Sequence, residues 1–317
     1  MVLDVITIGD GMIAMCPIKK GPIMFSNTFE KKIGGAELNV AIGCSRLGLK
    51  SGWISRLGKD DFGNYIKRSV MGEGVDVSQV ELVQDYTTSV YFREILSDGS
   101  SRSFYYRANS PTEKLEIDEV SEEYFKNAKV LHITGVLPSI NDHNKKIILD
   151  AIALAKKHNL IISFDPNIRL KMWTKEQATE FIKKILPEID ILLIGDEEVE
   201  LLCGHCDLKK AIKEFHDYGI KNVVIKRGEY GAVGSFGDEI CYVDAVKPRA
   251  VVDTVGAGDG FASGFLTAFL KGESLEETLR FANAVGSLVV GVEGDNEGLP
   301  YYEDVLVHLG ENKVVER

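Results

Sequence analysis

Cysteines and long apolar runs are scarce in this sequence. Its 317 residues include five scattered cysteines. An odd number of cysteines cannot all pair, which favours free thiols over a disulfide framework. Nowhere do about 18 apolar residues follow one another without a charge, which argues against a transmembrane helix. Residues 1–9 lack the basic segment and cleavage site of a secretion signal and predict a buried strand. We therefore expect a cytoplasmic protein.

Positive charge is in the minority. The chain has 37 Lys+Arg against 48 Asp+Glu, a formal net charge of −11 at pH 7. This balance opposes attraction to nucleic acids and to anionic membranes, so a small molecule is the expected partner. If that molecule is an anion, the overall field repels it, and a few local Arg or Lys side chains must attract it.

One cysteine pair has a spacing that metal and redox sites use. Cys203 and Cys206 stand in the segment Cys-Gly-His-Cys. A structural zinc site needs about four ligands, and the sequence has no second pair of this kind. A plain loop at the end of a helix is the favoured interpretation, with zinc binding or redox chemistry as the alternative.

Apolar segments of strand length alternate with helical patterns. The strand-like segments are residues 130–134, 160–164, 189–194 and 223–225. Between them, residues 145–158 carry one apolar helical stripe. This alternation predicts parallel strands with helical crossovers. The sequence therefore predicts an α/β fold, a doubly wound and mostly parallel sheet flanked by helices.

Two segments interrupt that rhythm. Residues 12–33 contain Pro17 and Pro22 and have no helical period, whereas residues 88–108 contain two β-rich runs around an Asp-Gly turn, which predict a hairpin. Both are too short for a domain of their own. We expect one domain, residues 1–317, with these segments forming a small β-sheet lid that excludes water from the site. A hairpin that mediates dimer contacts is the alternative, and both roles are compatible.

The strongest functional signal is the sequence DTVGAGDGFASGF at residues 253–265. Aromatic residues at every fourth position from 261 to 269 predict a helix that begins near Asp259. The small residues before it let an anion approach backbone N–H groups at the positive end of that helix. A carboxylate beside such an anion is unexpected unless it transfers a proton. An Asp that only caps the helix is the alternative.

This segment resembles the C-terminal signature of the ribokinase-like, or phosphofructokinase-B-type, carbohydrate kinases. Residues 34–41, GGAELNVA, resemble the family's sugar-binding glycine pair and asparagine. The two segments stand more than two hundred residues apart, with the expected α/β alternation between them. The resemblance implies a ribokinase-like fold, ATP-dependent phosphorylation of a sugar, and a homo-oligomer formed through the lid sheet.

The resemblance also assigns roles to residues. Asp259 becomes the catalytic base, and Gly256, Ala257 and Gly258 become an anion hole for the transferring γ-phosphoryl group. The residues that it implies for ATP binding are Asn167, Lys226, Gly228, Gly231 and Asn283. For Asn283, the alternative is an ordinary polar residue of a helix with no role in ATP binding.

Magnesium is implied together with ATP, but its motif is incomplete. The family's Asn-x-x-Glu pattern matches residues 195–198 only at Glu198, because Gly195 stands in place of the asparagine. A carboxylate still suits Mg²⁺, which prefers oxygen ligands and keeps several waters. We therefore assign Glu198 to the metal, through water. Asp196 and Glu197 could also order the metal's water shell, and the alternative for both is a solvated position in the first turn of a helix. A monovalent cation is a further cofactor that the family pattern leaves open.

Within the family, the sequence is similar to the 2-keto-3-deoxygluconate kinases in residues 36–39, 105–107 and 164–169. Such a sugar acid carries a carboxylate, which guanidinium groups bind in a bidentate manner. Arg107 and Arg169 are the candidates, and the γ-phosphate is an alternative target of Arg169. The residues expected to bind substrate are Gly34, Gly35, Asn39, Tyr91, Tyr106, Arg107, Arg169 and Asp295.

Three other functions compete with this prediction. Residues 9–14 fit the G-x-G-x-x-A pattern of NAD enzymes, but Pro17 and Pro22 fall in the helix that this pattern requires. A sugar sensor without catalysis gains nothing from a base beside phosphate. A fructokinase, or another sugar or nucleoside kinase, is the alternative within the family, and Arg107 is the residue that discriminates.

Overall fold

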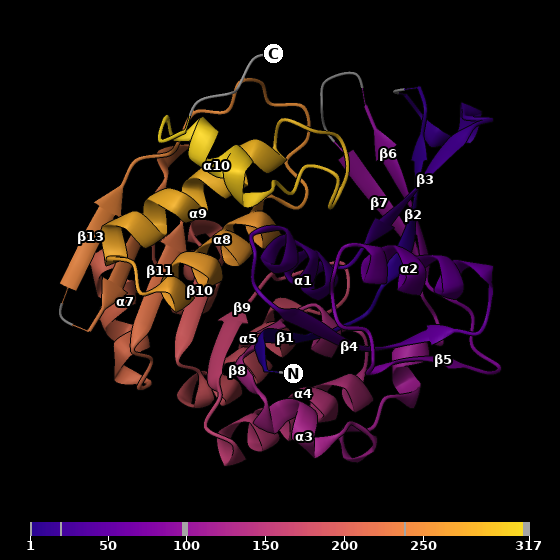
Figure 1. Ribbon diagram of the computed structural model, residues 1–317, viewed down its shortest axis with the longest axis horizontal. Helices are drawn as coiled ribbons and strands as arrows, with labels where there is room; N and C mark the ends of the chain where they lie inside the picture. Colours follow the sequence, from indigo (N-terminus) through magenta and orange to yellow (C-terminus); the bar gives the residue numbers. More distant parts are fainter. Residues whose placement is uncertain (1, 20, 97–100, 238, 313–317) are drawn as a thin grey trace.

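Two β-sheets of different size organise the chain (Figure 1). The computed structural model describes residues 2–19, 21–96, 101–237 and 239–312. Within these residues, the large sheet has nine strands in the order β13-β12-β11-β10-β9-β8-β1-β4-β5. They are parallel except at β12 and β13, which form an antiparallel edge. The strands are β1 (Leu3–Ile8), β4 (Ser51–Gly58), β5 (Val80–Val83), β8 (Ala128–Thr134), β9 (Ile161–Asp165), β10 (Ile191–Gly195), β11 (Asn222–Lys226), β12 (Ala232–Phe236) and β13 (Glu239–Val243).

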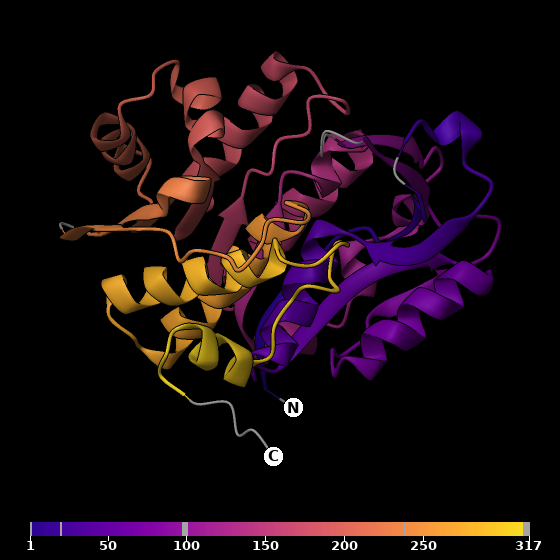
Figure 2. The same ribbon diagram turned by 90° about the horizontal axis from the view of Figure 1, so that it is seen from above.

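The small sheet has four strands within the described residues, in the order β3-β2-β6-β7. They are β2 (Met12–Pro17), β3 (Phe29–Gly34), β6 (Val90–Ile95) and β7 (Ser101–Tyr106). The Asp-Gly turn predicted between the last two falls at residues 97–100, outside the described residues. Seen from above (Figure 2), the yellow C-terminal segment runs beside the indigo strands, where the Lys32 ammonium donates to the Glu293 carbonyl at 2.8 Å.

Helices cover both faces of the large sheet. They are α1 (Ala36–Arg46), α2 (Asp61–Gly72), α3 (Glu122–Lys126), α4 (Asp142–Lys157), α5 (Lys175–Ile185), α6 (Asp196–Cys203), α7 (Leu208–Asp217), α8 (Ala257–Lys271), α9 (Leu275–Val289) and α10 (Tyr302–His308). Figure 1 shows α8 and α9 on one side of the large sheet and α4 on the other. None of the helices in the described part of the chain combines the length and the apolar character needed to span a membrane.

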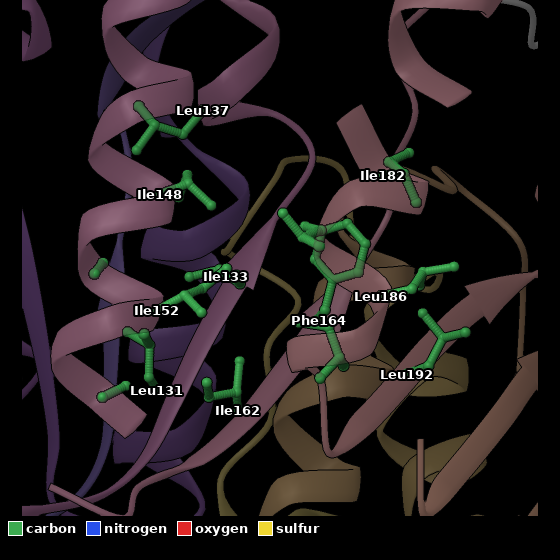
Figure 3. Packing of buried hydrophobic residues seen from close by; sticks show 14 of the residues in the cluster. Leu131, Ile133, Leu137, Ile148, Ile152, Ile162, Phe164, Ile182, Leu186 and Leu192 are labelled. Atoms are coloured by element: carbon green, nitrogen blue, oxygen red, sulfur yellow. The ribbon is translucent and has the colours of Figure 1, made fainter. Parts of the chain in front are cut away.

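Neighbouring residues of the buried strands serve opposite faces, because side chains alternate along a strand. In β8, Val130 packs in a cluster with Phe265 of α8. Leu131 packs in the other cluster, where Figure 3 shows it near Ile152 of α4. Strands buried on both faces explain why their sequences are nearly continuous apolar runs. The predicted doubly wound α/β fold with a small second sheet is therefore confirmed.

Candidate active site

A cavity of about 700 Å³ is lined by one face of the small sheet and by residues at the carboxyl ends of the large sheet's strands. Ligands of open α/β sheets bind at this edge. The cavity brings together most of the residues that the sequence singles out. Those that line it are Gly35, Asn39, Tyr91, Arg107, Asn167, Arg169, Glu198, Lys226, Gly256, Gly258, Asp259 and Asp295.

Asp259 lies in the first turn of α8 and is buried. Its carboxylate accepts a hydrogen bond from the Asn39 side-chain amide at 2.8 Å and a longer one from Asn167 at 3.5 Å. Burial raises the pKa of Asp259 to about 7; the charges of Asp165 and Asp295 act in the same direction, and the Asn39 hydrogen bond opposes them. A carboxylate with a pKa near neutrality can accept a proton and later release it.

The backbone before Asp259 can adopt its conformation only with glycine. Gly256 has φ of 77°, in the left-handed region, and an added Cβ would lie 2.2 Å from the Asp295 carbonyl oxygen. The first N–H groups of a helix lack partners within the helix, and Gly256 and Gly258 line the cavity. The start of α8 therefore offers the cavity both N–H donors and the positive end of the helix dipole.

A lysine and two carboxylates meet on the side of the cavity formed by β9, β11 and α6. Lys226 Nζ lies 2.5 Å from Asp165 Oδ2. Although burial opposes its charged form, the pKa of Lys226 is raised by Asp165 and Glu198. Burial and the charge of Asp165 raise the pKa of Glu198. The ammonium is paired with Asp165 and only influences Glu198 through its charge, so the two carboxylates leave an excess of negative charge, which a divalent cation would relieve.

Glu198 is fixed by the backbone rather than by an asparagine. It accepts N–H hydrogen bonds from Ile168 at 2.7 Å and from Gly195 at 2.8 Å. The residue that replaces the family's asparagine therefore holds the glutamate through its main chain. Neither Asp196 nor Glu197 lines the cavity.

The glycine pair in front of α1 gives the small sheet room to approach. A Cβ on Gly34 would lie 2.5 Å from the Asp295 carboxylate and 2.8 Å from the Tyr91 hydroxyl. These two groups touch, because the hydroxyl donates to the carboxylate at 2.6 Å. Gly35 has φ of 151°, and a Cβ there would lie 2.5 Å from the Asp10 carbonyl oxygen. Larger residues would push the small sheet away from the cavity.

Two arginines line the cavity, one paired with a buried carboxylate and the other exposed. Arg107 Nη2 donates to buried Asp10 at 2.8 Å, which holds the guanidinium in place. Its Nη1 lies 3.6 Å from the Met172 sulfur, and its Nε has no hydrogen-bond partner in the described part of the chain. Arg169 is exposed and makes no ion pair with any described residue. Both guanidinium groups therefore keep donors for an anionic ligand.

Tyr106 requires a correction, because its side chain is on the wrong face of the small sheet. Tyr105, not Tyr106, lies opposite Tyr91 in the β6–β7 ladder and lines the cavity with it. Tyr106 is 68% exposed on the other face, where its ring packs against Phe92 at 5.6 Å. A one-residue shift along a strand changes the face that a side chain occupies.

Several residues predicted to bind ATP lie outside this cavity. Gly228 and Gly231 flank the short turn after β11 and both have positive φ, 52° and 81°. Asn283 in α9 is buried and donates to the Asp244 carbonyl at 3.3 Å. Ala257, the middle residue of the predicted anion hole, does not line the cavity either. The nucleotide assignments therefore remain predictions. Within that group, Lys226 and Asn167 line the cavity and contact its carboxylates, Asp165 and Asp259 respectively.

Sequence reasoning gave no role to a buried ion pair beside the cavity. Both terminal nitrogens of Arg93 in β6 donate to the two carboxylate oxygens of Asp253, with Nη1 and Oδ2 2.5 Å apart. Asp253 also accepts N–H hydrogen bonds from Val255 and Gly294, each at 3.1 Å. The pair ties the small sheet to the loop that leads into α8. Asp10, Tyr105 and Asp165 also lie at the cavity and received no individual role from the sequence.

Comparison with known proteins identifies the family of this chain. Residues 3–301 match the model of the pfkB family carbohydrate kinases. The whole chain is 35% identical to the 2-dehydro-3-deoxygluconokinase of Bacillus subtilis, covering 98% of that protein. It is 31% identical to the 5-dehydro-2-deoxygluconokinase of Clostridium beijerinckii, with 98% and 94% of the two chains covered.

Among solved structures, a candidate ribokinase II from E. coli, in complex with ATP and Mg²⁺, superposes with a TM-score of 0.91. The identity is 27%, over 98% of this chain and all of that one. The predicted family and the ribokinase-like fold are both confirmed. The chain belongs to the pfkB family of carbohydrate kinases, enzymes that transfer a phosphoryl group to an alcohol acceptor.

Proposed function

We propose that the protein phosphorylates the C6 hydroxyl of 2-keto-3-deoxygluconate with ATP, giving 2-keto-3-deoxy-6-phosphogluconate. This sugar acid is the 2-dehydro-3-deoxygluconate in the name of the Bacillus subtilis relative. The observation that carries the proposal is Arg107, which lines the same cavity as Asp259 and is held there by Asp10. A carboxylate on the substrate gives the remaining guanidinium donors a partner, which a neutral sugar does not.

Asp259 acts as the general base in this proposal. It accepts the proton of the C6 hydroxyl while that oxygen attacks the γ-phosphorus in line and ADP leaves. Asn39 orients the carboxylate through its amide N–H, 2.8 Å away. The N–H groups at residues 256–258 stabilise the charge that the transferring phosphoryl oxygens carry in the transition state.

Magnesium fits the carboxylates of Asp165 and Glu198, which line the same cavity with a single nearby ammonium, Lys226, paired with Asp165. Mg²⁺ prefers oxygen ligands and keeps several waters, and both Glu198 oxygens already accept backbone N–H groups. Contact through water therefore suits this glutamate. A Mg²⁺ ion held there would supply positive charge beside the transferring phosphoryl group; the structure of the E. coli relative holds ATP and Mg²⁺. A monovalent cation stays a prediction.

Substrate preference tests the proposal. In an ADP-release assay with ATP·Mg²⁺, we expect 2-keto-3-deoxygluconate to be preferred over fructose and ribose. Arg107→Lys keeps a positive charge beside Asp10 but loses the planar fork. Because a hydrogen bond to a charged group contributes about 1.5–3 kcal/mol, this variant should raise KM for the sugar acid about 10–100-fold. Its KM for fructose should change little.

Arg169→Ala is the matched variant, because it removes an exposed guanidinium from the same cavity without leaving Asp10 unpaired. A rise in KM confined to sugar acids would assign Arg169 to the substrate carboxylate, and a fall in kcat for all sugars would assign it to the γ-phosphate. Equal losses of Arg107→Lys on the acid and on fructose would contradict a carboxylate site.

A second candidate substrate is 5-dehydro-2-deoxygluconate, because the Clostridium beijerinckii relative is named for its phosphorylation. It is also a gluconate derivative, so it would satisfy the same guanidinium. It belongs in the substrate panel beside 2-keto-3-deoxygluconate. If it has the higher kcat/KM, the acid-sugar kinase stands and the proposed substrate is wrong.

We also place the protein in the cytoplasm, where ATP is available, and propose that it forms a dimer through the outer aromatic patch of the small sheet. This patch consists of Phe29, Phe92, Phe104 and Tyr106. The Phe92 ring contacts those of Phe29 and Tyr106, at 5.5 Å and 5.6 Å between centroids. Phe104 and Tyr106 remain 42% and 68% exposed. Clustered exposed aromatic side chains mark interaction surfaces, and a second copy of the same sheet can pair with itself about a two-fold axis.

Replacing Phe104 and Tyr106 together with serine should shift the protein to monomer in sedimentation equilibrium. Both side chains are exposed, so folding is expected to persist in circular dichroism. Tyr242→Ser, at an exposed position on the distant edge strand β13, should leave the association state unchanged. A wild-type protein that is monomeric at all concentrations would rule out the dimer.

A further inference from the structure

Three side chains that metals favour meet at the far end of α6 from Glu198. Cys203 ends this helix, His205 lies in the loop that follows, and Glu214 comes from α7. One ligand atom of each residue lies within 4.8 Å of the others. The His205 Nε2 and the Glu214 Oε1 are 3.2 Å apart. The sequence indicated only the Cys-Gly-His-Cys segment, and the fold adds a carboxylate from the next helix.

The ligand set selects the class of metal. A thiolate, an imidazole and a carboxylate together suit zinc-like divalent cations and do not suit Mg²⁺ or Ca²⁺. With metal–ligand bonds of about 2.0–2.3 Å and tetrahedral angles, neighbouring ligand atoms lie about 3.3–3.6 Å apart. The observed separation of the imidazole and the carboxylate, 3.2 Å, is close to this spacing. The thiol lies within 4.8 Å of both, so a bound ion would draw the Cys203 sulfur closer by rotation of its side chain.

The local charge also favours a cation. Gly204, with φ of 76°, closes α6 in the left-handed conformation, and the last carbonyl groups of a helix carry partial negative charge. Glu214 is now partnered by His205 and by Lys210, whose Nζ lies 3.6 Å away. Lys210 is largely exposed and can turn to solvent. Its departure leaves the carboxylate to the ion.

Binding has two costs. The N–H of Asp207 donates to His205 Nδ1 at 3.3 Å, and this weak hydrogen bond is lost because coordination through Nε2 places the ring proton on Nδ1. Burial and the neighbouring Glu214 raise the pKa of the Cys203 thiol to about 11, so its proton passes to solvent when the metal binds. Thiolate–metal bonding of the zinc type regularly offsets such costs.

We propose that Cys203, His205 and Glu214 bind a zinc-like divalent cation, with water in the open fourth position, and that the ion clamps α6 to α7. Its role is separate from catalysis. The opposite end of α6 carries Glu198 at the cavity, so the clamp stabilises the helix that presents this glutamate. Neither the identity of the sugar nor the presence of ATP enters the proposal.

Zinc titration of the full chain tests the site. After chelator treatment, one Zn²⁺ per chain should bind in the presence of excess Mg²⁺, which occupies carboxylate sites at the cavity, and should raise Tm. Co²⁺ in its place should give the visible spectrum of a tetrahedral thiolate complex. Cys203→Ala and Glu214→Gln should each weaken binding by at least about 10–100-fold, the loss typical of removing even an outer-shell partner.

Cys206→Ala is the matched control, because it removes the neighbouring thiol of the same loop, which lies near Glu200 instead. It should bind Zn²⁺ like the wild type. The proposal is overturned if the wild type retains no Zn²⁺ after dialysis, if Cys203→Ala binds as tightly as the wild type, or if Cys206→Ala is the variant that loses the ion. A protein that fails on every sugar but still binds Zn²⁺ would leave this site intact and reject the kinase substrate alone.

Discussion

Asp259→Asn should lower kcat by about 10²–10⁴-fold, the usual contribution of general acid–base catalysis. The amide has nearly the shape of the carboxylate and can still accept the hydrogen bond from Asn39 through its oxygen. KM for the sugar and for ATP should therefore change much less than kcat. Steady-state ADP release on the preferred sugar measures all three values.

Asp295→Asn makes the same chemical change at another buried carboxyl of the cavity. Asp295 accepts the Tyr91 hydroxyl and lies outside the first turn of α8, so we expect its loss to raise KM for the sugar more than it lowers kcat. If Asp259→Asn keeps a near-normal kcat, or if Asp295→Asn loses as much, Asp259 is not the base.

The pH dependence gives an independent check. Because burial raises the pKa of Asp259 to about 7, the fraction of ionised base, and with it kcat/KM, should rise as the pH increases through neutrality. Asp259→Asn should lack this rise of kcat/KM with pH.

The stability of the fold should change in the opposite sense. The folded chain binds the Asp259 proton up to about pH 7, whereas the unfolded chain releases it near 3.8. Ionisation of Asp259 therefore destabilises the fold as the pH rises through that window. Above pH 7, Asp259→Asn should therefore have a higher Tm than the wild type.

The sequence could predict the fold and the position of Asp259 because both depend on local patterns. Strand-length apolar runs followed by helical stripes define the sheet, and a glycine-rich turn before a helix defines an anion site wherever it occurs. Parallel strands then bring their carboxyl ends to one edge, which is why Asn167 and Lys226 meet Asp259 at the same cavity.

Local patterns do not predict which face of a strand lines the cavity or which distant residues pair with each other. Tyr105 and Tyr106 are adjacent, and only the register against Tyr91 decides which ring enters the cavity. Arg93 and Asp253 are separated by 160 positions. A tertiary contact of this kind leaves no periodicity or spacing in the sequence. The family resemblance assigned roles to residues around the reacting groups and gave no indication of the Arg93–Asp253 ion pair.

Arg93→Met should destabilise the protein by about 3–5 kcal/mol, because it leaves Asp253 as a buried carboxylate without its cation. Both side chains are almost fully buried, and the other groups that Asp253 accepts from are neutral N–H groups. Denaturant unfolding measures the loss. Arg102→Met, in the same hairpin but 65% exposed and 3.9 Å from Glu94, should cost less than about 1 kcal/mol.

The double variant Arg93→Met with Asp253→Asn separates the charge from the packing. Without the carboxylate, the apolar side chain no longer faces an unpaired charge, so the double variant should be more stable than Arg93→Met alone. Its kcat should be lower than that of the wild type, because the ion pair no longer ties the small sheet to the loop that leads into α8, and the N–H groups at the start of that helix are held less firmly. If the stability losses of Arg93→Met and of Asp253→Asn add up to the loss of the double variant, the two residues are not coupled. A wild-type kcat in the double variant would show that the ion pair stabilises the fold without positioning the anion hole.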